Sequence, residues 1–283
     1  MTGGADDATG VDDAGRASFV SELASAATAA DGSPPFNDQA LVEARRGQAR
    51  VLGDRHAAAI VRGDEVELVV HPDDRREGRG AELLQRVIDE TTGPLAVWAH
   101  GDLPASRHLA ARFALTETRR LLQQRASVPA DPAAPKRRTG DELRAFRPGT
   151  DDAAWLDLNA RAFADHPEQG SIDQADLDAR RAEPWFDAGD FVLLWRGDEL
   201  IAFCWLKLEA GQPGEFYAVG VSPDHQGEGL GGVVVDAGLA RLRDRGVDTA
   251  ALYVEGDNTA ALRLYAARGF ADHAVDVQYT LTR

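Results

Sequence analysis

The sequence predicts an α/β (α+β) protein built from two similar halves, each with a mixed, mostly antiparallel sheet flanked by helices. A segment of the first half returns in the second half, with an apolar strand before it and a helical pattern after it in both places. A stretch rich in proline and alanine, residues 128–135, separates the two copies. The length of 283 residues suits two domains of about 140 residues each.

The repeated segment is a glycine-containing loop. The first copy, residues 70–80, reads VHPDDRREGRG, and the second, residues 221–231, reads VSPDHQGEGLG. Gln226 follows Arg75 by 151 residues. A period this long indicates duplicated domains and not a solenoid of short repeats.

The repeat extends downstream of the loop. In each half we expect a helix, a strand, a short helix and a closing strand, in that order. The first half places them at residues 81–90, 95–99, up to 113–115, and 118–125; the second half at 232–243, 250–254, up to 268–270, and 274–281.

The second half begins with further elements before its loop. They are a strand at 143–147, helices at 151–163 and 174–181, and paired strands at 191–196 and 200–208. The resulting organisation is a disordered N-terminus (1–15), an N-terminal domain (16–128), a linker (129–140) and a C-terminal domain (141–283).

Composition excludes several classes of function. With 47 acidic and 31 basic side chains the net charge is −16, which disfavours nucleic acid and anionic membranes as partners. Solubility is the simpler reading of this acidity, and adaptation to a saline cytoplasm stays open. Residues 1–16 lack the features of a signal peptide, and no apolar stretch reaches the roughly 20 residues of a membrane span, so we expect a cytoplasmic monomer.

The cysteine and histidine residues of the sequence do not indicate metal binding or thiol chemistry. Cys204 is the single cysteine and lies in an apolar run, so a buried strand position is favoured over a reactive thiol. The seven histidines are scattered without a metal-binding pattern, and we predict no metal. A G-x-S-x-G elbow is also missing, which argues against a serine hydrolase.

Glycines two residues apart at a strand-to-helix turn let the backbone approach a ligand and leave N–H groups free to bind a pyrophosphate. Taken alone, the pattern is weak, and neither the dinucleotide fingerprint nor the P-loop is met. In context, Gln226, Gly229 and Gly231 resemble the acetyl-CoA loop of the GNAT acetyltransferases, as do Arg75, Gly78 and Gly80. Residues 258–270 resemble the second signature of that superfamily.

The GNAT resemblance implies acetyl-CoA as cosubstrate and two sets of binding residues. The C-terminal set is Val219, Gly220, Val221, Gln226, Gly227, Glu228, Gly229, Leu230, Gly231, Gly232 and Asn258. The N-terminal set, for a possible second molecule of acetyl-CoA, is Leu68, Val69, Val70, Arg75, Arg76, Glu77, Gly78, Arg79 and Gly80.

Acetyl transfer to an amine requires a base for the amine and an acid for the departing thiolate. Glu215, at the start of the strand that ends at the loop, is the candidate base. Tyr265 is the candidate acid, since a phenol with a pKa near 10 suits a thiolate leaving group. Spacing alone leaves two other readings open: a solvent-facing carboxylate for Glu215 and a core side chain for Tyr265.

A closer resemblance covers nearly the whole chain, from about residue 19 to residue 283. Residues 164–170, 183–187, 214–221 and 252–258, with residues 31–32 and 66–79 in the first half, are similar to the mycothiol synthase family of actinobacteria. This implies acetylation of the cysteinyl amine of a glucosamine–inositol conjugate, with Glu215 as base and Tyr265 as acid. It also implies that Asp38, Glu168, Lys207, Glu215 and Tyr253 contact the acceptor, although the family would have Glu at position 38.

The N-terminal half keeps its loop but not the chemistry. Alignment of the halves puts Ala110 where Tyr265 stands, Leu103 at the place of Asn258, and Asp64 opposite Glu215. We therefore expect this half to be inactive, while it can still hold acetyl-CoA.

Two other functions remain possible at this point. A tandem GNAT enzyme could act on another amine, such as an aminoglycoside, a polyamine or a protein N-terminus. A non-catalytic acyl-CoA-binding module would keep the loops without acid and base, which describes the N-terminal half better than the C-terminal half.

Overall fold

The structure is a computed structural model that describes residues 13–164 and 167–282, without the side chains of residues 13–18, 38, 167 and 168. Most of the N-terminus expected to be disordered therefore lies outside the described residues. Residues 13–15, however, are helical, since they form the start of α1 (Asp13–Asp31). An aspartate in the first turn followed by alanines favours a helix there.

The chain divides by its internal contacts into two compact units. Unit 1 comprises residues 1–122, 255–257 and 274–283, and unit 2 comprises residues 123–254 and 258–273. Both include segments from distant parts of the sequence, so they differ from the contiguous domains expected above. The expected boundaries of independently folding domains stay a prediction.

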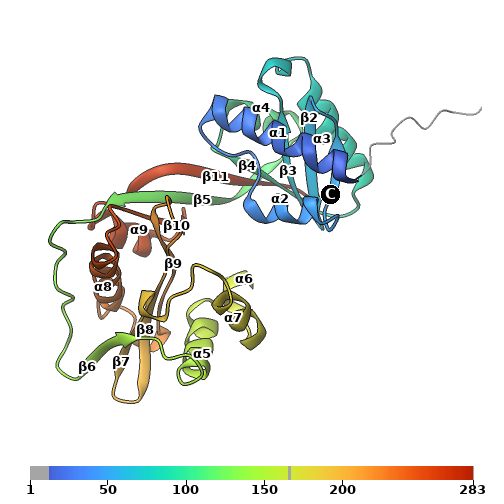
Figure 1. Cartoon of the computed structure of the whole chain (residues 1–283). Helices are drawn as coiled ribbons and strands as arrows, with labels where there is room; N and C mark the ends of the chain where they lie inside the picture. Colours follow the sequence, from blue (N-terminus) through green and yellow to red (C-terminus); the bar gives the residue numbers. More distant parts are fainter. Residues whose placement is uncertain (1–12, 165–166, 283) are drawn as a thin grey trace, which may run out of the picture. The chain divides into compact units, whose positions relative to one another are not determined.

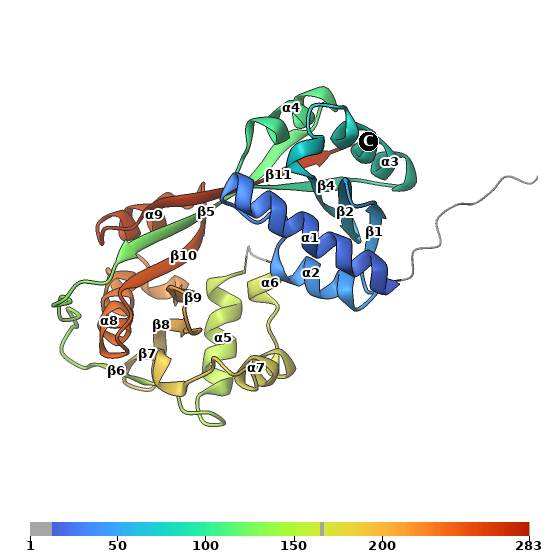
Figure 2. The same ribbon diagram turned by 45° about the horizontal axis from the view of Figure 1, so that its top comes forward.

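Unit 1 is a sheet covered by helices on both faces. Its elements are α1, α2 (Asp38–Arg45), β1 (Arg50–Gly53), β2 (Ala57–Arg62), β3 (Glu65–Val70), the 3₁₀ turn η1 (Pro72–Asp74), α3 (Arg79–Glu90), β4 (Leu95–His100) and α4 (Pro104–Arg112). Strands β1, β2 and β3 pair antiparallel, and β4 joins β3 in parallel. Alternation along β2 builds two cores: Ala58 and Ile60 pack with α1 and α2, while Ala59 and Val61 pack with α3 (Figure 2).

Unit 2 repeats this plan with a larger aromatic core. Its elements are β6 (Asp141–Ala145), α5 (Asp152–Ala162), α6 (Pro167–Gly170), α7 (Gln174–Arg181), η2 (Ala188–Asp190), β7 (Phe191–Arg196), β8 (Glu199–Lys207), β9 (Gly214–Val221), η3 (Pro223–His225), α8 (Leu230–Asp244), β10 (Thr249–Glu255) and α9 (Thr259–Ala266). Strands β6 to β9 pair antiparallel in sequence order, and β10 pairs in parallel with β9.

Helices α5 and α7 cover one face of this sheet and α8 covers the other (Figure 1). On the α5 face, Trp155 meets the rings of Phe191, Phe203 and Trp205 edge to face. On the α8 face, the missing side chain of Gly238 admits Phe216 and Cys204, because a Cβ there would lie 2.6 Å from Phe216 and 2.9 Å from Cys204. Cys204 is fully buried, as its apolar context predicted.

The two closing strands do not stay with their own halves. Strand β11 (Ala271–Leu281) pairs antiparallel with β4 of the first half, from Asp276 opposite His100 to Leu281 opposite Leu95. Strand β5 (Thr116–Ser127) lies between β11 and β10 in the strand order. The expectation that each half closes its own sheet was wrong. At 12 and 11 residues, β5 and β11 have about twice the usual strand length, so each contributes to both units.

Candidate active site

The two repeated loops have the same backbone geometry. Helix α8 begins after Gly229 at φ 79° and α3 begins after Gly78 at φ 90°, and neither glycine provides a side-chain cap. A left-handed residue here favours glycine, and the first N–H groups of each helix are left to face a ligand. The predicted C-terminal residues follow in order: Val219, Gly220 and Val221 end β9, Gln226 to Gly229 form the loop, and Leu230 to Gly232 form the first turn of α8.

The second glycine of each loop allows close packing at equivalent places. A Cβ on Gly231 would lie 3.1 Å from Leu264, and one on Gly80 would lie 3.5 Å from Leu109 and 3.3 Å from Val70. The predicted N-terminal residues match as well: Leu68 to Val70 end β3, Arg75 to Gly78 form the loop, and Arg79 and Gly80 start α3. Both loops can therefore present backbone N–H groups to an anion.

Charged side chains of the loops are bound to other parts of the protein. Both terminal nitrogens of Arg75 donate to the carboxylate of Asp31, at 2.8 and 2.7 Å. In the second loop, Glu228 accepts hydrogen bonds from Arg138 at 2.6 Å and from Arg196 at 3.0 Å. The side chains of Arg75 and Glu228 are therefore already engaged within the protein, which leaves the loop backbones to contact a ligand.

The parallel strand pairs open at the same place in both units. The pairing of β9 with β10 covers three positions, from Gly214 opposite Ala250 to Phe216 opposite Leu252. Both strands continue beyond it, to Val221 and Glu255. Likewise β3 and β4 pair from Glu65 to Glu67 and then separate. In each unit the strands separate beside a glycine loop. Beyond that point, backbone N–H and C=O groups of β9 and β3 can form hydrogen bonds with another partner.

A β-bulge at Tyr217 adjusts the C-terminal site. Opposite β8, Trp205 pairs with Ala218 and Leu206 pairs with Phe216, so Tyr217 is the extra residue. Bulges commonly redirect side chains beside active sites. Here the bulge turns both Tyr217 and Ala218 toward the α5 face, while Phe216 stays on the α8 face.

Glu215 and Lys207 are directly opposite each other in the β8–β9 pair. Burial raises the pKa of the Glu215 carboxyl, the positive charge of Lys207 lowers it, and Glu209 raises it further. Burial alone would lower the pKa of Lys207, but its contact with Glu209 at 3.0 Å and the charge of Glu215 raise it. The two candidates thus form a partly desolvated charged pair, which excludes the solvent-facing reading of Glu215.

An aromatic wall adjoins this pair. The Nζ of Lys207 lies 5.7 Å from the ring centre of Trp185, and Trp185 lies 5.3 Å from the ring of Tyr217. Arg180 of α7 donates to the Tyr217 hydroxyl at 2.9 Å. Tyr217 and Arg180 are not among the site residues that the sequence predicts. Their spacing of 37 residues carries no local signal, although the family-like segment 183–187 lies close by in the chain.

Tyr265 lies on the opposite side of the sheet from Glu215. Its ring meets Phe270 at 5.7 Å, and Phe270 meets Phe216 at 5.8 Å, on the face that α8 covers. The side chain is 7% exposed, and burial raises the pKa of its phenol. The candidate acid and the candidate base are therefore separated by β9, beside the open end of the β9–β10 ladder.

The other predicted residues are placed as follows. The side chain of Asn258 caps α9 by accepting from the N–H of Ala261 at 3.1 Å. Tyr253 is 48% exposed on β10, and its hydroxyl accepts from Gln123 at 2.8 Å, so it is not a core residue. Asp38 begins α2 and Glu168 lies in α6, but their side chains lie outside what the structure describes.

The first unit has the same backbone arrangement around its loop as the candidate site, but it lacks a residue equivalent to the candidate acid Tyr265. Leu103 precedes α4 as Asn258 precedes α9, and Leu103 makes no side-chain cap. Ala114 and Gly269 both have positive φ, 52° and 82°, which supports the alignment of the two halves through the chain reversal after these helices. Ala110, buried at 4% exposure, then takes the place of Tyr265.

The described residues hold neither a cluster suited to a metal ion nor a helix that could cross a membrane. No group of three or more His, Cys, Asp or Glu side chains at residues 13–164 and 167–282 is arranged to hold a metal ion. Within the same ranges, every helix is too short or too polar to cross a membrane.

Comparison with known proteins decides the family. Residues 153–270 match the model of the acetyltransferase (GNAT) family. The mycothiol acetyltransferase of Sanguibacter keddieii is 47% identical over 93% of this chain and 92% of its own length. That of Thermobispora bispora is also 47% identical, over 92% and 94% of the two chains. This chain belongs to the mycothiol acetyltransferase family.

Solved structures agree on the tandem fold. A GCN5-related N-acetyltransferase from Sphaerobacter thermophilus superposes with a TM-score of 0.73 at 21% identity, over 93% of this chain and 91% of that one. A tandem GNAT protein from the clavulanic acid biosynthesis pathway gives a TM-score of 0.66 at 16% identity, over 94% and 95%. As a member of the mycothiol acetyltransferase family, the chain is an acetyltransferase with two GNAT-type halves, as the sequence predicted.

Proposed function

We propose that this protein transfers the acetyl group of acetyl-CoA to the cysteinyl amine of cysteinyl-glucosaminyl-inositol, giving mycothiol. The names of its relatives support this acceptor, since they are mycothiol acetyltransferases at 47% identity over nearly the full length. The catalytic half is the C-terminal one, which has Glu215 and Tyr265 in addition to the glycine loop.

The observation that carries the proposal is the placement of acid and base on the two faces of β9. Glu215 shares the α5 face with Lys207 and the aromatic wall, whereas Tyr265 packs on the α8 face. The open end of the β9–β10 ladder connects these faces. The thioester of acetyl-CoA, placed at this opening, would meet the acceptor amine on the α5 face, near Glu215. Its sulfur would remain on the α8 face, near Tyr265.

The reaction then follows from the position of each group. Glu215 takes a proton from the ammonium of the acceptor, and the free amine attacks the thioester carbonyl carbon. A C–N bond forms, the C–S bond breaks, and Tyr265 gives its phenolic proton to the CoA thiolate. The nitrogen then loses its second proton, which restores the phenol of Tyr265, and Glu215 releases the first proton to solvent. The raised pKa of Glu215 brings the base closer to neutral pH. Burial raises the pKa of Tyr265, so its phenol is protonated at neutral pH, and its proton transfer has to be driven by the strongly basic thiolate that develops as the C–S bond breaks.

Acetyl-CoA fits the residues around this opening. We assign its pyrophosphate to the N–H groups from Gln226 to Gly232, at the N-terminus of α8, where anions are stabilised without basic side chains. The amides of its pantetheine arm can pair with the free edge of β9 from Val219 to Val221, in the manner of an added strand. Asn258 holds the start of α9 beside them.

The acceptor has one ammonium and many hydroxyl groups. Glu215 and Lys207 can bind these groups, and Trp185 and Tyr217 offer aromatic faces to a sugar ring. Roles for Asp38, Glu168 and Tyr253 rest on the family resemblance, as do the expectations of a monomer and of a cytoplasmic location.

We also propose that the N-terminal loop binds a second molecule of acetyl-CoA, which does not react. It repeats the left-handed glycine, the close approach at Gly80 and the open ladder of the catalytic half. Isothermal titration of ligand-free protein should give two sites, and Gly78→Asp should remove one of them. A stoichiometry of one that Gly78→Asp leaves unchanged would reduce the N-terminal loop to a turn.

The direct test of the reaction identifies the product. Protein supplied with acetyl-CoA and the conjugate should add one acetyl group to the acceptor, and the cysteine thiol should still react with a thiol reagent afterwards. A product whose thiol is blocked would show transfer to sulfur. No transfer at all would contradict the proposed function.

A further inference from the structure

We propose that the ion pair between Asp236 and Arg268 positions the acid Tyr265 against the acetyl-CoA loop. The proposal rests on the acid role of Tyr265 given above. It assigns to Asp236 and Arg268 a role in turnover that requires no contact with either substrate.

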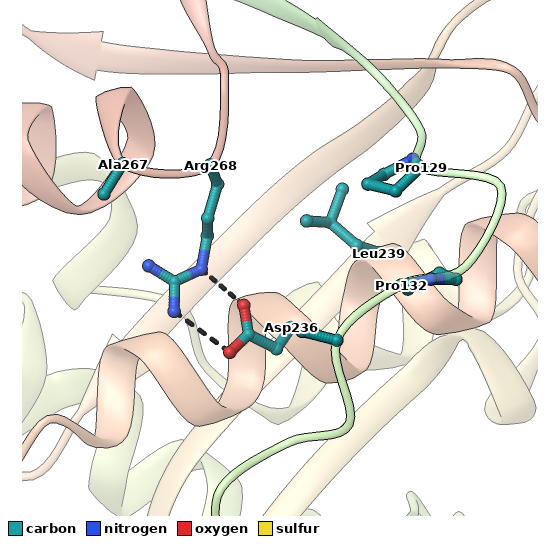
Figure 3. Close-up of a pocket in the computed structure, with 7 residues that line it drawn as sticks. Pro129, Pro132, Asp236, Leu239, Ala267 and Arg268 are labelled. Carbon is teal, nitrogen blue, oxygen red and sulfur yellow. Dashed lines mark hydrogen bonds and ion pairs between the residues drawn. The ribbon is translucent and has the colours of Figure 1, made fainter.

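The pair joins the two helices that carry the loop and the acid (Figure 3). The Nε of Arg268 donates to one carboxylate oxygen of Asp236 at 2.6 Å, and Nη2 donates to the other at 3.1 Å. Nη1 of the same guanidinium donates to the carbonyl oxygen of Leu264 at 3.1 Å. Three directed bonds therefore fix Arg268 between α8 and the last turn of α9.

Helix α9 needs such an anchor because it has only eight residues. A helix of this length is not stable alone, so tertiary contacts at its two ends determine its position. Asn258 caps its start, and the chain after its end turns back through the N–H of Arg268, which donates to the carbonyl of Tyr265 at 2.9 Å. A shift of Arg268 would therefore move Tyr265 directly.

The guanidinium also lies close to the helix turn that follows the acetyl-CoA loop. A Cβ on Gly232 would lie 2.6 Å from Nη2 of Arg268, so a side chain there would displace the guanidinium from its present position along α8. Gly232 belongs to the first turn of α8. The same side chain thus sets the distance between that turn and the helix that carries Tyr265.

Comparison of the two halves separates this role from general helix packing. In unit 1 the equivalents of Gly232, Asp236, Tyr265 and Arg268 are Ala81, Gln85, Ala110 and Phe113. By contrast, the packing of Leu264 on Gly231 is kept as Leu109 on Gly80. Unit 1, which lacks the acid, also lacks the glycine and the ion pair that surround Tyr265 in unit 2. It keeps only the contact that packs its two helices together.

The surroundings of the pair argue against a purely stabilising role. Its two side chains keep 19% and 20% of their surface exposed and face a pocket lined by Pro129, Pro132, Leu239 and Ala267 (Figure 3). Ion pairs that reach solvent usually add little to stability. Geometry is the property that a two-pronged arginine–carboxylate contact supplies best.

The test combines Asp236→Asn and Arg268→Lys with Tyr265→Phe. Each of the first two should lower kcat roughly 10- to 100-fold and change KM for acetyl-CoA by no more than about twofold, because a misplaced acid affects the chemical step. Arg241→Lys is the matched control: Arg241 also lies on α8 and bonds Asp190 at 2.7 Å, but it does not touch α9. It should keep kcat near wild type with a similar change in melting temperature.

The double variant Asp236→Asn/Tyr265→Phe gives the sharpest result. If the pair acts through Tyr265, the double variant should turn over no more than about twofold slower than Tyr265→Phe alone. The positioning role would be overturned if the kcat losses of Asp236→Asn and Tyr265→Phe multiplied in the double variant. It would also be overturned if both Asp236→Asn and Arg268→Lys kept a wild-type kcat. Either result would leave the acid role intact. Full activity of Tyr265→Phe would instead overturn the acid role, and the positioning role with it.

Discussion

Burial changes the acid–base properties of Glu215 and Tyr265 in the same direction: it makes the Glu215 carboxylate a stronger base and the Tyr265 phenol a weaker acid. Desolvation disfavours the charged form of both side chains and raises both pKa values. The carboxyl becomes a stronger base, and the phenol stays protonated over a wider pH range. In the proposed reaction, single positions on β9 and α9 would supply the two proton transfers.

Replacement of Tyr265 by phenylalanine removes one hydroxyl and little volume, so the fold should be kept. General acid catalysis is typically worth roughly 10²- to 10⁴-fold, and kcat should fall within that range. Single-turnover kinetics with saturating acetyl-CoA measure the chemical step. An unchanged chemical step would return Tyr265 to a packing role.

The pH dependence of kcat/KM should report Glu215. The base is active as the carboxylate, so activity rises with pH through its pKa, and that pKa lies above the ordinary glutamate value of 4.5. Glu209→Gln removes a charge that raises this pKa and should move the acid limb to lower pH. Glu215→Gln should lower kcat/KM and abolish the limb; a limb that persists in Glu215→Gln would assign the base elsewhere.

The sequence identifies residues that belong to local motifs, but not their distant partners. Glu215, Gln226 and Tyr265 became candidates because each lies within a short segment that resembles a family motif. Asp236 and Arg268 are 32 residues apart on two helices, and Tyr217 acquires its direction from a bulge. Such contacts depend on tertiary packing, which periodicity along the chain does not encode.

At the scale of elements, a buried histidine joins three strands of unit 1. His100 on β4 contacts Glu67 of β3 at 3.3 Å and Asp276 of β11 at 3.2 Å. Burial alone would lower the pKa of His100, but its hydrogen bonds and charge interactions with the two carboxylates raise it to about 9. The protonated imidazole therefore holds together strands that come from both ends of the sequence.

This raised pKa predicts a loss of stability at alkaline pH. The folded pKa of about 9 exceeds the ordinary value of 6.5, so the stabilisation is complete below pH 6.5 and is lost as pH rises through 9. The shift corresponds to roughly 3 kcal/mol of unfolding free energy. Urea denaturation at pH 6 and pH 9 should show the decrease in wild type, and a much smaller one in His100→Gln. Equal decreases in both proteins would contradict the assignment.

The elements that follow each loop were predicted from the sequence, but α1, α2, β1 and β2 and the pairing of the longest strands were not. Glycines at helix starts and alternating apolar residues place α3, α8 and β9 within a few residues of their observed ends. The pairing of β11 with β4 cannot be predicted from the local sequence pattern, because an antiparallel partner at the sheet edge can come from any part of the chain. The one-turn helix α6 was also missed, because four residues carry no period.

At the scale of the whole molecule, the exchange of closing strands makes the halves dependent on each other. A fragment of residues 141–283 would lack residues 123–127 of β5, which belong with β10 in unit 2, and would leave residues 274–281 without β4. We expect such a fragment to show no cooperative unfolding transition and no turnover. A sharp thermal transition with wild-type kcat would show that the C-terminal half is autonomous.

The central claim concerns the acceptor, and a comparison of acceptors tests it most directly. The values of kcat/KM should be measured with acetyl-CoA and, in turn, cysteinyl-glucosaminyl-inositol, free cysteine and a polyamine. We predict a preference of several orders of magnitude for the conjugate, because polar groups of the site would stay unpaired with an acceptor that lacks the sugar hydroxyls. Equal or faster acetylation of the polyamine would contradict the assignment to mycothiol synthesis, while the protein would remain an acetyltransferase.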